Sequence, residues 1–251
     1  MLLLGLALAL AGCEPAWEFA VFGDSSPDSA EAPMPAAFGK IVERINDSKA
    51  ELALFAGDLV RGRTIHREVV AGQYERALAA IKPLRARLLI VPGNHDVDGP
   101  GGAELFAQHF GKTPWVVVHR GWTFIGLNTE LPGMRGMIAG EQLVWLQDRL
   151  AERKHPGKTV ILMHRPIHPT LGPAHRYHSV PQPLLHELFR QEGVTAVFCG
   201  HEHHFHQLEK DGVLYITTGG AGADLLPGGF FHYVQVHVNG DRLSAKNVCL
   251  D

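Results

Sequence analysis

The segment Leu88-Leu-Ile-Val-Pro-Gly-Asn-His-Asp96 passes from an apolar run into a short polar cluster. A continuous apolar run of this length is typical of a strand that is buried on both faces of a sheet. Five further runs of the same kind lie at 19–22, 52–55, 123–126, 160–163 and 196–199. Helical patterns separate several of them, at 38–45, 73–86, 141–154 and from 184 onward. The alternation predicts a single α/β domain with a mixed or parallel sheet.

Each apolar run is followed by a side chain that can bind a metal: Asp24, Asp58, Asn94, Asn128, His164 and His201. These residues follow one another at intervals of 34, 36, 34, 36 and 37 residues. A βαβ unit needs about 30 or more residues, so each interval accommodates one strand and one crossover. The carboxyl ends of parallel strands share one edge, so we expect these side chains to converge there. A single polar residue after a strand is usually a turn or helix cap, but six in series favour a metal site.

Five short segments sharpen this interpretation: Gly23-Asp24, Gly57-Asp58-Leu59-Val60, Pro92-Gly-Asn-His-Asp96, Met163-His-Arg-Pro166 and Gly200-His-Glu-His203. In this order and spacing they resemble the calcineurin-like metallophosphoesterases, and the resemblance extends from Asp24 to about Gly222. The segment Thr217–Gly222 is similar to a glycine-rich segment of bacterial members related to purple acid phosphatases. The resemblance implies a four-layer α/β/β/α sandwich, in which two mixed sheets are flanked by helices.

The resemblance also implies roles for the polar residues. Asp58 would bridge two metal ions, the first completed by Asp24 and His203 and the second by Asn94, His164 and His201. Carboxylate and amide oxygens combined with imidazoles suit Fe, Mn or Zn. A metal-bridging hydroxide would then hydrolyse a small phosphate mono- or diester, with His95 as the general acid. Asp96 would orient the His95 imidazole and raise its pKa.

The sequence departs from the family pattern at the first motif. Most members have Asp-x-His there, whereas this chain has Asp24-Ser25-Ser26. Purple acid phosphatases have a tyrosine three residues after the bridging aspartate, a position occupied here by Arg61. The remaining ligand of the first metal would be Ser26, a water or a distant histidine. We therefore expect a weaker first metal site and no purple Fe(III) chromophore.

Several cationic and polar residues are candidates for substrate contacts: Arg61, Arg165, His168 and Asn128. Arg61 follows Asp58 closely, as does Arg63, and both are candidate phosphate contacts by proximity. Asn128 ends a strand, where a structural role is the alternative. Arg165 and His168 begin an irregular segment that reaches Pro183, and this segment is either a loop over the site or a solvated loop with incidental histidines. The runner-up function is a catalytically weak envelope protein that binds metal or phosphate.

The composition narrows the function further. Lys and Arg number 23 against 26 Asp and Glu, and the net charge of −3 argues against a nucleic-acid-binding protein. Sixteen histidines are a surplus that metal ligation would partly explain. Bound cations, rather than Lys and Arg, would then attract an anionic substrate.

The first residues resemble a lipoprotein signal peptide. The apolar run that ends at Leu10-Ala11-Gly12-Cys13 is too short to span a bilayer. We expect residues 1–12 to be removed, Cys13 to be lipidated, 13–18 to form a tether and 19–251 to form the phosphoesterase domain. The protein would then be a monomer in the bacterial cell envelope, periplasmic or on the outer membrane, touching membrane only through its lipid. Cys199 and Cys249 could pair in an exported protein, although two cysteines give no framework pattern.

Overall fold

The computed structural model describes residues 15–250, and these residues form two sheets. The first sheet has the spatial order β11 (Arg242–Cys249), β10 (His232–Asn239), β1 (Trp17–Phe22), β2 (Ala50–Phe55) and β3 (Arg87–Ile90). The second has the order β4 (Trp115–His119), β5 (Trp122–Gly126), β6 (Thr159–Leu162), β7 (Ala196–Cys199), β9 (Val213–Thr218) and β8 (Phe205–Lys210). Both sheets are mixed, because β1–β3 and β5–β6–β7–β9 run parallel and their outer neighbours run antiparallel.

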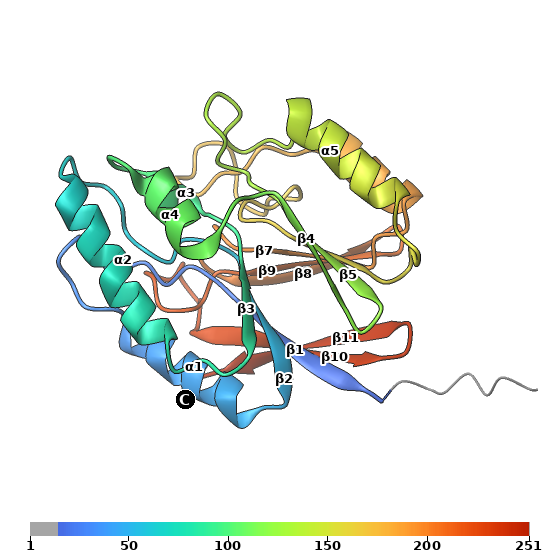
Figure 1. Cartoon of the computed structure of the whole chain (residues 1–251), viewed down its shortest axis with the longest axis horizontal. Helices are drawn as coiled ribbons and strands as arrows, with labels where there is room; N and C mark the ends of the chain where they lie inside the picture. The colour runs from blue at the N-terminus through green and yellow to red at the C-terminus, as the bar shows by residue number, and fades with distance from the viewer. Residues whose placement is uncertain (1–14, 251) are drawn as a thin grey trace, which may run out of the picture.

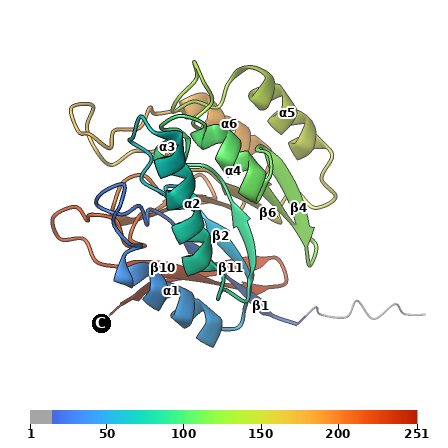
Figure 2. The ribbon, with the colours of Figure 1, turned by 60° about the vertical axis from the view of Figure 1, so that its left-hand side comes forward.

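Helices cover the outer face of each sheet (Figures 1 and 2). On the first sheet lie α1 (Ala36–Asp47), α2 (Arg67–Ile81) and the shorter α3 (Asn94–Val97) and α4 (Gly102–Phe110). On the second lie α5 (Gly140–Ala151) and α6 (Pro183–Gln191). The four-layer α/β/β/α sandwich of the prediction is therefore confirmed.

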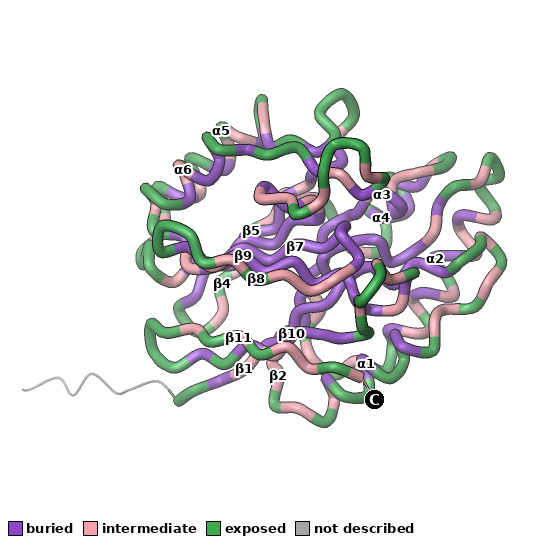
Figure 3. The backbone as a smooth tube through the Cα atoms, turned by 180° about the vertical axis from the view of Figure 1, so that it is seen from behind, coloured by how far each residue is buried: buried purple, intermediate pink, exposed green. Residues whose placement is uncertain are grey.

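Three apolar clusters hold the layers together. One joins β1 and β2 to α1 and α2, a second fills the space between the sheets, and a third joins β5–β7 to α5 and α6. In the middle cluster, Phe19 of β1 meets Phe124 of β5 and Phe198 of β7 edge-on, with ring centroids 5.4 and 5.9 Å apart. The parallel strands β1, β2, β5, β6, β7 and β9 are accordingly buried over most of their length (Figure 3). The apolar runs are continuous because both faces of these strands are covered.

All six predicted strands are present, but their connections differ from a plain βαβ series. The step from Asn94 to Asn128 leaves the first sheet and enters the second through α4 and the β4–β5 hairpin. The helix predicted at 73–86 spans Arg67–Ile81 instead, because Pro83 cannot continue a helix. The strands β8–β11 and β4 were not predicted. β4, β8, β10 and β11 are antiparallel to their neighbours and include partly or fully exposed residues, as strands with one solvated face do, whereas β9 is a largely buried strand parallel to β7.

The chain ends bear on the domain and cysteine predictions. The first strand begins at Trp17, so Trp17 and Glu18 belong to the sheet rather than to a tether. The predicted signal peptide and Cys13 lie outside the described residues. Cys199 is a buried free thiol and Cys249 an exposed one, so the two do not pair. No helix within residues 15–250 has the length and apolar content needed to cross a membrane.

Candidate metal centre

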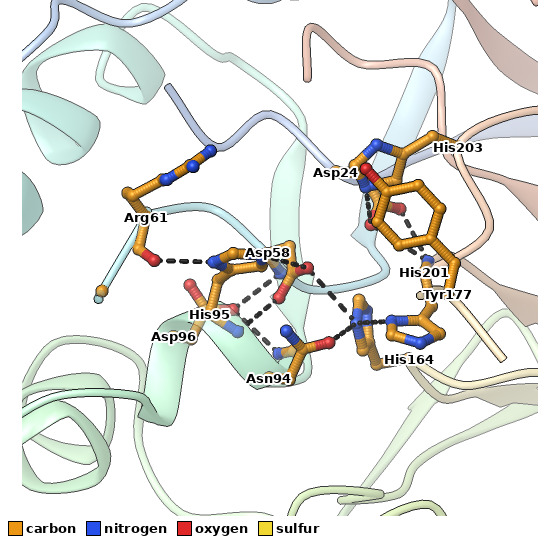
Figure 4. A network of polar contacts seen from close by, with 12 residues as sticks. Asp24, Asp58, Arg61, Asn94, His95, Asp96, His164, Tyr177, His201 and His203 are labelled. Atoms are coloured by element: carbon orange, nitrogen blue, oxygen red, sulfur yellow. Dashed lines mark hydrogen bonds and ion pairs between the residues drawn. The ribbon is translucent and has the colours of Figure 1, made fainter. Parts of the chain in front are cut away.

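The predicted ligands converge where the carboxyl ends of strands from both sheets meet (Figure 4). Asp24, Asp58 and Asn94 follow β1, β2 and β3 of the first sheet and supply oxygen atoms. His164, His201 and His203 follow β6 and β7 of the second sheet and supply nitrogen atoms. The centre therefore lies on the seam between the sheets, with one type of ligand from each side.

One group of ligand atoms gathers around His164. Its Nδ1–H donates to the Ala56 carbonyl over 2.8 Å, which leaves Nε2 with a lone pair directed into the centre. This Nε2 lies 3.5 Å from Asp58 Oδ2, 3.2 Å from Asn94 Oδ1 and 3.1 Å from His201 Nδ1. Asp58, His164 and His201 are close enough to hold one ion, and Asn94 adds a fourth ligand atom.

A second group shares Asp58 and adds Asp24 and His203. His203 Nε2 lies 3.5 Å from Asp24 Oδ1. Its Nδ1–H donates to the Asp224 carbonyl over 2.5 Å, so Nε2 is again the atom free for a metal. No histidine beyond His203 joins this group within residues 15–250, which leaves Ser26 and water as the open choices for its fourth ligand.

The backbone of the centre is tightly constrained. Asp24, Asp58 and His201 have φ values of 62°, 61° and 70°, in the left-handed region that non-glycine residues rarely adopt. A Cβ at Gly93 would lie 2.2 Å from Asp58 Oδ1, and one at Gly200 would lie 2.3 Å from Asp24 Oδ2. Gly93 precedes Asn94 and Gly200 precedes His201 because a carboxylate of the neighbouring strand end passes directly over the chain at each position.

The electrostatics of the centre call for a cation. Asp24 and Asp58 are fully or almost fully buried, at 0% and 1% exposure. Burial and the charges of Asp24 and Asp96 raise the pKa of Asp58 well above its usual range. Burial opposes protonation of His203, yet Asp24 and the Asp224 carbonyl raise its pKa above the ordinary value. Two buried carboxylates lie beside the lone pairs of imidazoles and an amide oxygen. Metal ions fit this arrangement, because they would neutralise the buried charges and bind the lone pairs.

His95 borders the centre, and its Nδ1–H donates to the Arg61 carbonyl over 2.6 Å. Its Nε2 therefore faces the centre, 4.0 Å from Asp58 Oδ2. Burial and the charges of Arg63 and Arg61 lower the pKa of His95 to about 4, although the hydrogen bond to the Arg61 carbonyl acts in the opposite direction.

The predicted role of Asp96 is wrong. Its carboxylate accepts four backbone N–H bonds, from Asp58 and Gly93 on Oδ2 and from Leu59 and Val60 on Oδ1. It therefore holds the loop that carries Asp58, while the Arg61 carbonyl orients His95. Because Asp96 stands at the third position of α3, its side chain turns back onto the backbone.

Of the other predicted substrate contacts, Arg165 lies at the centre and the rest do not. Arg165 lines a cavity beside the centre, and its guanidinium binds Glu130 through two nitrogens and contacts His201 Nε2. The Arg61 guanidinium instead donates to the Pro27 carbonyl. Asn128 Oδ1 accepts the N–H of Glu130 in a local turn, which is a structural role.

His168 is not in this cavity. Its ring packs edge-on against Tyr215, with the centroids 4.6 Å apart, and burial lowers its pKa to about 4.

Sequence reasoning missed several residues that border the centre. Tyr177 stacks on His203, with ring centroids 4.2 Å apart, and its hydroxyl donates to Asp224. Arg135 lines the cavity together with Arg165 and with Arg63, which was already a candidate phosphate contact because it lies close to Asp58 in the sequence. Tyr177 and Arg135 lie in irregular segments away from the strand-end motifs, and Asp224 comes two residues after the glycine-rich segment Thr217–Gly222, so no local pattern marks these side chains.

Comparisons with known proteins agree with this geometry. Residues 19–205 match the family model of the calcineurin-like phosphoesterases. The chain is 30% identical over 172 residues to a cAMP/cGMP dual specificity phosphodiesterase of Mycobacterium tuberculosis, which covers 66% of this chain and 53% of that protein. It is 24% identical over 205 residues to a 3′,5′-cyclic adenosine monophosphate phosphodiesterase of Haemophilus influenzae, covering 79% of this chain and 72% of that protein.

Among solved structures, a dimetal phosphatase from Danio rerio superimposes with a TM-score of 0.71 at 14% identity, covering 93% of this chain and 96% of that one. At this identity the likeness shows the fold alone. The chain spans about half the length of curated relatives such as the Mycobacterium protein.

Proposed function

Because the chain belongs to the calcineurin-like phosphoesterase family, we propose that it is a metal-dependent hydrolase of phosphate esters. The observation that carries the proposal is the pair of ligand groups that share Asp58, with His95 beside them and a cavity in front. Asp24, Asp58 and His203 would hold one cation, and Asp58, Asn94, His164 and His201 a second. Cations of the Fe, Mn or Zn type would supply Lewis acidity and a water of lowered pKa for attack on phosphorus.

The chain's own residues would position the ester. Arg165, fixed by Glu130, presents its guanidinium to the cavity and can bind phosphoryl oxygens. His95 directs Nε2 toward the same space, because Nδ1–H is engaged by the Arg61 carbonyl. Since burial lowers the pKa of His95, its protonated form needs an anionic partner, which a bound phosphate would provide. His95 would then donate a proton to the leaving oxygen.

The names of the curated relatives favour one second candidate, the hydrolysis of cyclic nucleotides. A cyclic 3′,5′-phosphodiester would use the same ligand groups and the same proton donor. The catalytically weak metal- or phosphate-binding protein stays the alternative from another class, supported by the first ligand group, which has three protein ligands.

The test is an activity screen with a paired measurement of metal content. The purified protein is assayed against nitrophenyl mono- and diesters and 3′,5′-cyclic AMP, each with added Mn²⁺, Zn²⁺ or Fe²⁺. Turnover of at least one ester is expected. Stoichiometric bound metal without any turnover would reject the hydrolase and leave the binding protein. His95→Ala should remove most turnover and keep the metals, while His237→Ala, an exposed histidine on β10, should leave both unchanged.

We further propose that the protein is exported and carried on the envelope by a lipid on Cys13, as the motif in the sequence suggests. Labelled palmitate should enter the full-length chain and should not enter a Cys13→Ala variant. Equal labelling of the two proteins, or no labelling of either, would contradict the proposed lipid anchor.

A further inference from the structure

The cavity beside the ligand cluster has a volume of about 200 Å³. All of its described lining residues are polar or ionisable, and four of them are arginines: Arg63, Arg135, Arg165 and Arg176. The lining carboxylates are Asp58, which belongs to the ligand cluster, and Asp98. Four guanidinium groups around so small a space form an anion-binding wall.

Two of these arginines each have an acidic partner and a ring contact. Arg165 forms a two-nitrogen ion pair with Glu130, whose side chain is fully buried. Arg176 pairs with Asp224 and lies over the Tyr177 ring, 4.4 Å from its centroid. The buried Glu130 fixes the Arg165 guanidinium before any ligand arrives, so Arg165 adds little ordering cost on binding, whereas Arg176 is 65% exposed and is held less firmly.

Arg63 and Arg135 are different. Arg63 has no hydrogen bond or ion pair with residues 15–250, and its backbone φ is 45°. Arg135 makes one hydrogen bond of 3.2 Å, from Nη2 to Asp98 Oδ1, and its side chain is 53% exposed. A guanidinium has five N–H donors, so both residues have donors to spare at the cavity.

We propose that this site, given the phosphoesterase activity proposed above, selects small phosphate monoesters that carry a second anionic group. The scissile phosphate would lie at the ligand cluster beside Arg165. Arg63 and Arg135 would bind the second group, a phosphate or a carboxylate.

The size and lining of the cavity support this class over cyclic nucleotides. Pockets that enclose drug-sized ligands have volumes of about 300–1,000 Å³ and mostly apolar walls. This cavity is smaller, and Tyr177 is the aromatic residue of its described lining, so it offers a nucleobase little apolar surface. A cyclic 3′,5′-phosphodiester also has a single negative charge, so it offers no second anionic group to Arg63 and Arg135.

The test compares substrates that differ only in the second anion: glycerol 3-phosphate with 3-phosphoglycerate, and fructose 6-phosphate with fructose 1,6-bisphosphate. We expect kcat/KM to be about tenfold or more higher for the doubly anionic member of each pair. In an Arg63→Gln/Arg135→Gln variant this ratio should fall toward one. Arg242→Gln, an exposed arginine at the start of β11, is the matched control and should keep both the ratio and the activity.

A binding measurement separates the failure of this inference from that of the proposed function. Pyrophosphate should bind the protein about tenfold more tightly than orthophosphate, by titration calorimetry, and the double variant should lose that difference. Turnover of nitrophenyl phosphate without preference in either substrate pair would overturn the inference and keep the hydrolase. Tighter pyrophosphate binding without any turnover would reject the hydrolase and keep the site for a second anionic group. A preference for 3′,5′-cyclic AMP over both doubly anionic substrates would also overturn the inference.

Discussion

Asp96→Asn tests whether Asp96 holds the backbone around Asp58 or serves His95. Asp96 is fully buried, and its two oxygens accept N–H bonds of 2.8, 2.8, 2.9 and 3.1 Å. Asparagine keeps one oxygen and places an NH₂ group against the other two backbone donors. Two hydrogen bonds are lost and two buried N–H groups are left without acceptors.

Each buried donor without a partner costs about 1–3 kcal/mol, so the free energy of unfolding should fall by about 2–6 kcal/mol. For a chain of this size that corresponds to a decrease in Tm of roughly 4 to 24 °C. The loop at Asp58 should also loosen, so metal content should fall together with stability.

The assay follows thermal unfolding by circular dichroism, with metal content and turnover measured on the same samples. Asp98→Asn is the matched control, because Asp98 lies two residues further on and its described side-chain bond is the one to Arg135. It should lower the free energy of unfolding by less than about 1 kcal/mol. A parent-like Tm and metal content for Asp96→Asn, with lost turnover, would refute the backbone role and restore the one read from the sequence.

Two further predictions follow from the geometry. Gly93→Ala should lower the metal content and cost about 1–3 kcal/mol of stability, because the new Cβ would lie 2.2 Å from Asp58 Oδ1 and 2.4 Å from the Asp58 backbone N. Gly157→Ala is the control, because a Cβ at Gly157 would meet open space. Equal metal content and equal Tm of the two variants would contradict this prediction. The pKa of Glu51 is lowered, chiefly by its hydrogen bond with Arg120. Glu51 therefore stabilises the fold at a pH above its unfolded-state pKa, and this contribution is lost as the pH falls through the lowered folded-state pKa. Glu51→Gln should therefore reduce stability at pH 7 by less than about 1 kcal/mol and leave it equal to the parent at pH 2, as acid titrations of Tm would show.

The sequence predicted those parts of the molecule whose signal is local. Strands buried on both faces appear as continuous apolar runs, and the ligands follow them directly, as Asp58 follows β2 and His164 follows β6. The interval between Asn94 and Asn128 looked like the others because it has a similar length. Its path through α4 and the β4–β5 hairpin depends on which sheet each strand joins, and that choice is made by long-range packing.

Side-chain direction was the other limit. Asp96 follows His95 in the chain, and adjacency suggested a pair, but helical geometry turns the carboxylate toward Gly93 and Asp58. Arg61 and Arg63 were both candidates because they are near Asp58 in the sequence, and of the two it is Arg63 that lines the cavity. Tyr177 and Asp224 are 47 residues apart and meet through loop conformations that carry no periodic pattern.

The division of ligand types between the two sheets has a consequence for biosynthesis. The oxygen ligands Asp24, Asp58 and Asn94 emerge from the ribosome first, and the imidazoles of His164, His201 and His203 follow. A chain released only as far as α4 holds hard oxygen ligands and lacks the nitrogen ligands that favour transition metals. Selective capture of a transition metal would therefore await the docking of the second sheet, and we expect loading to follow folding rather than to occur during synthesis.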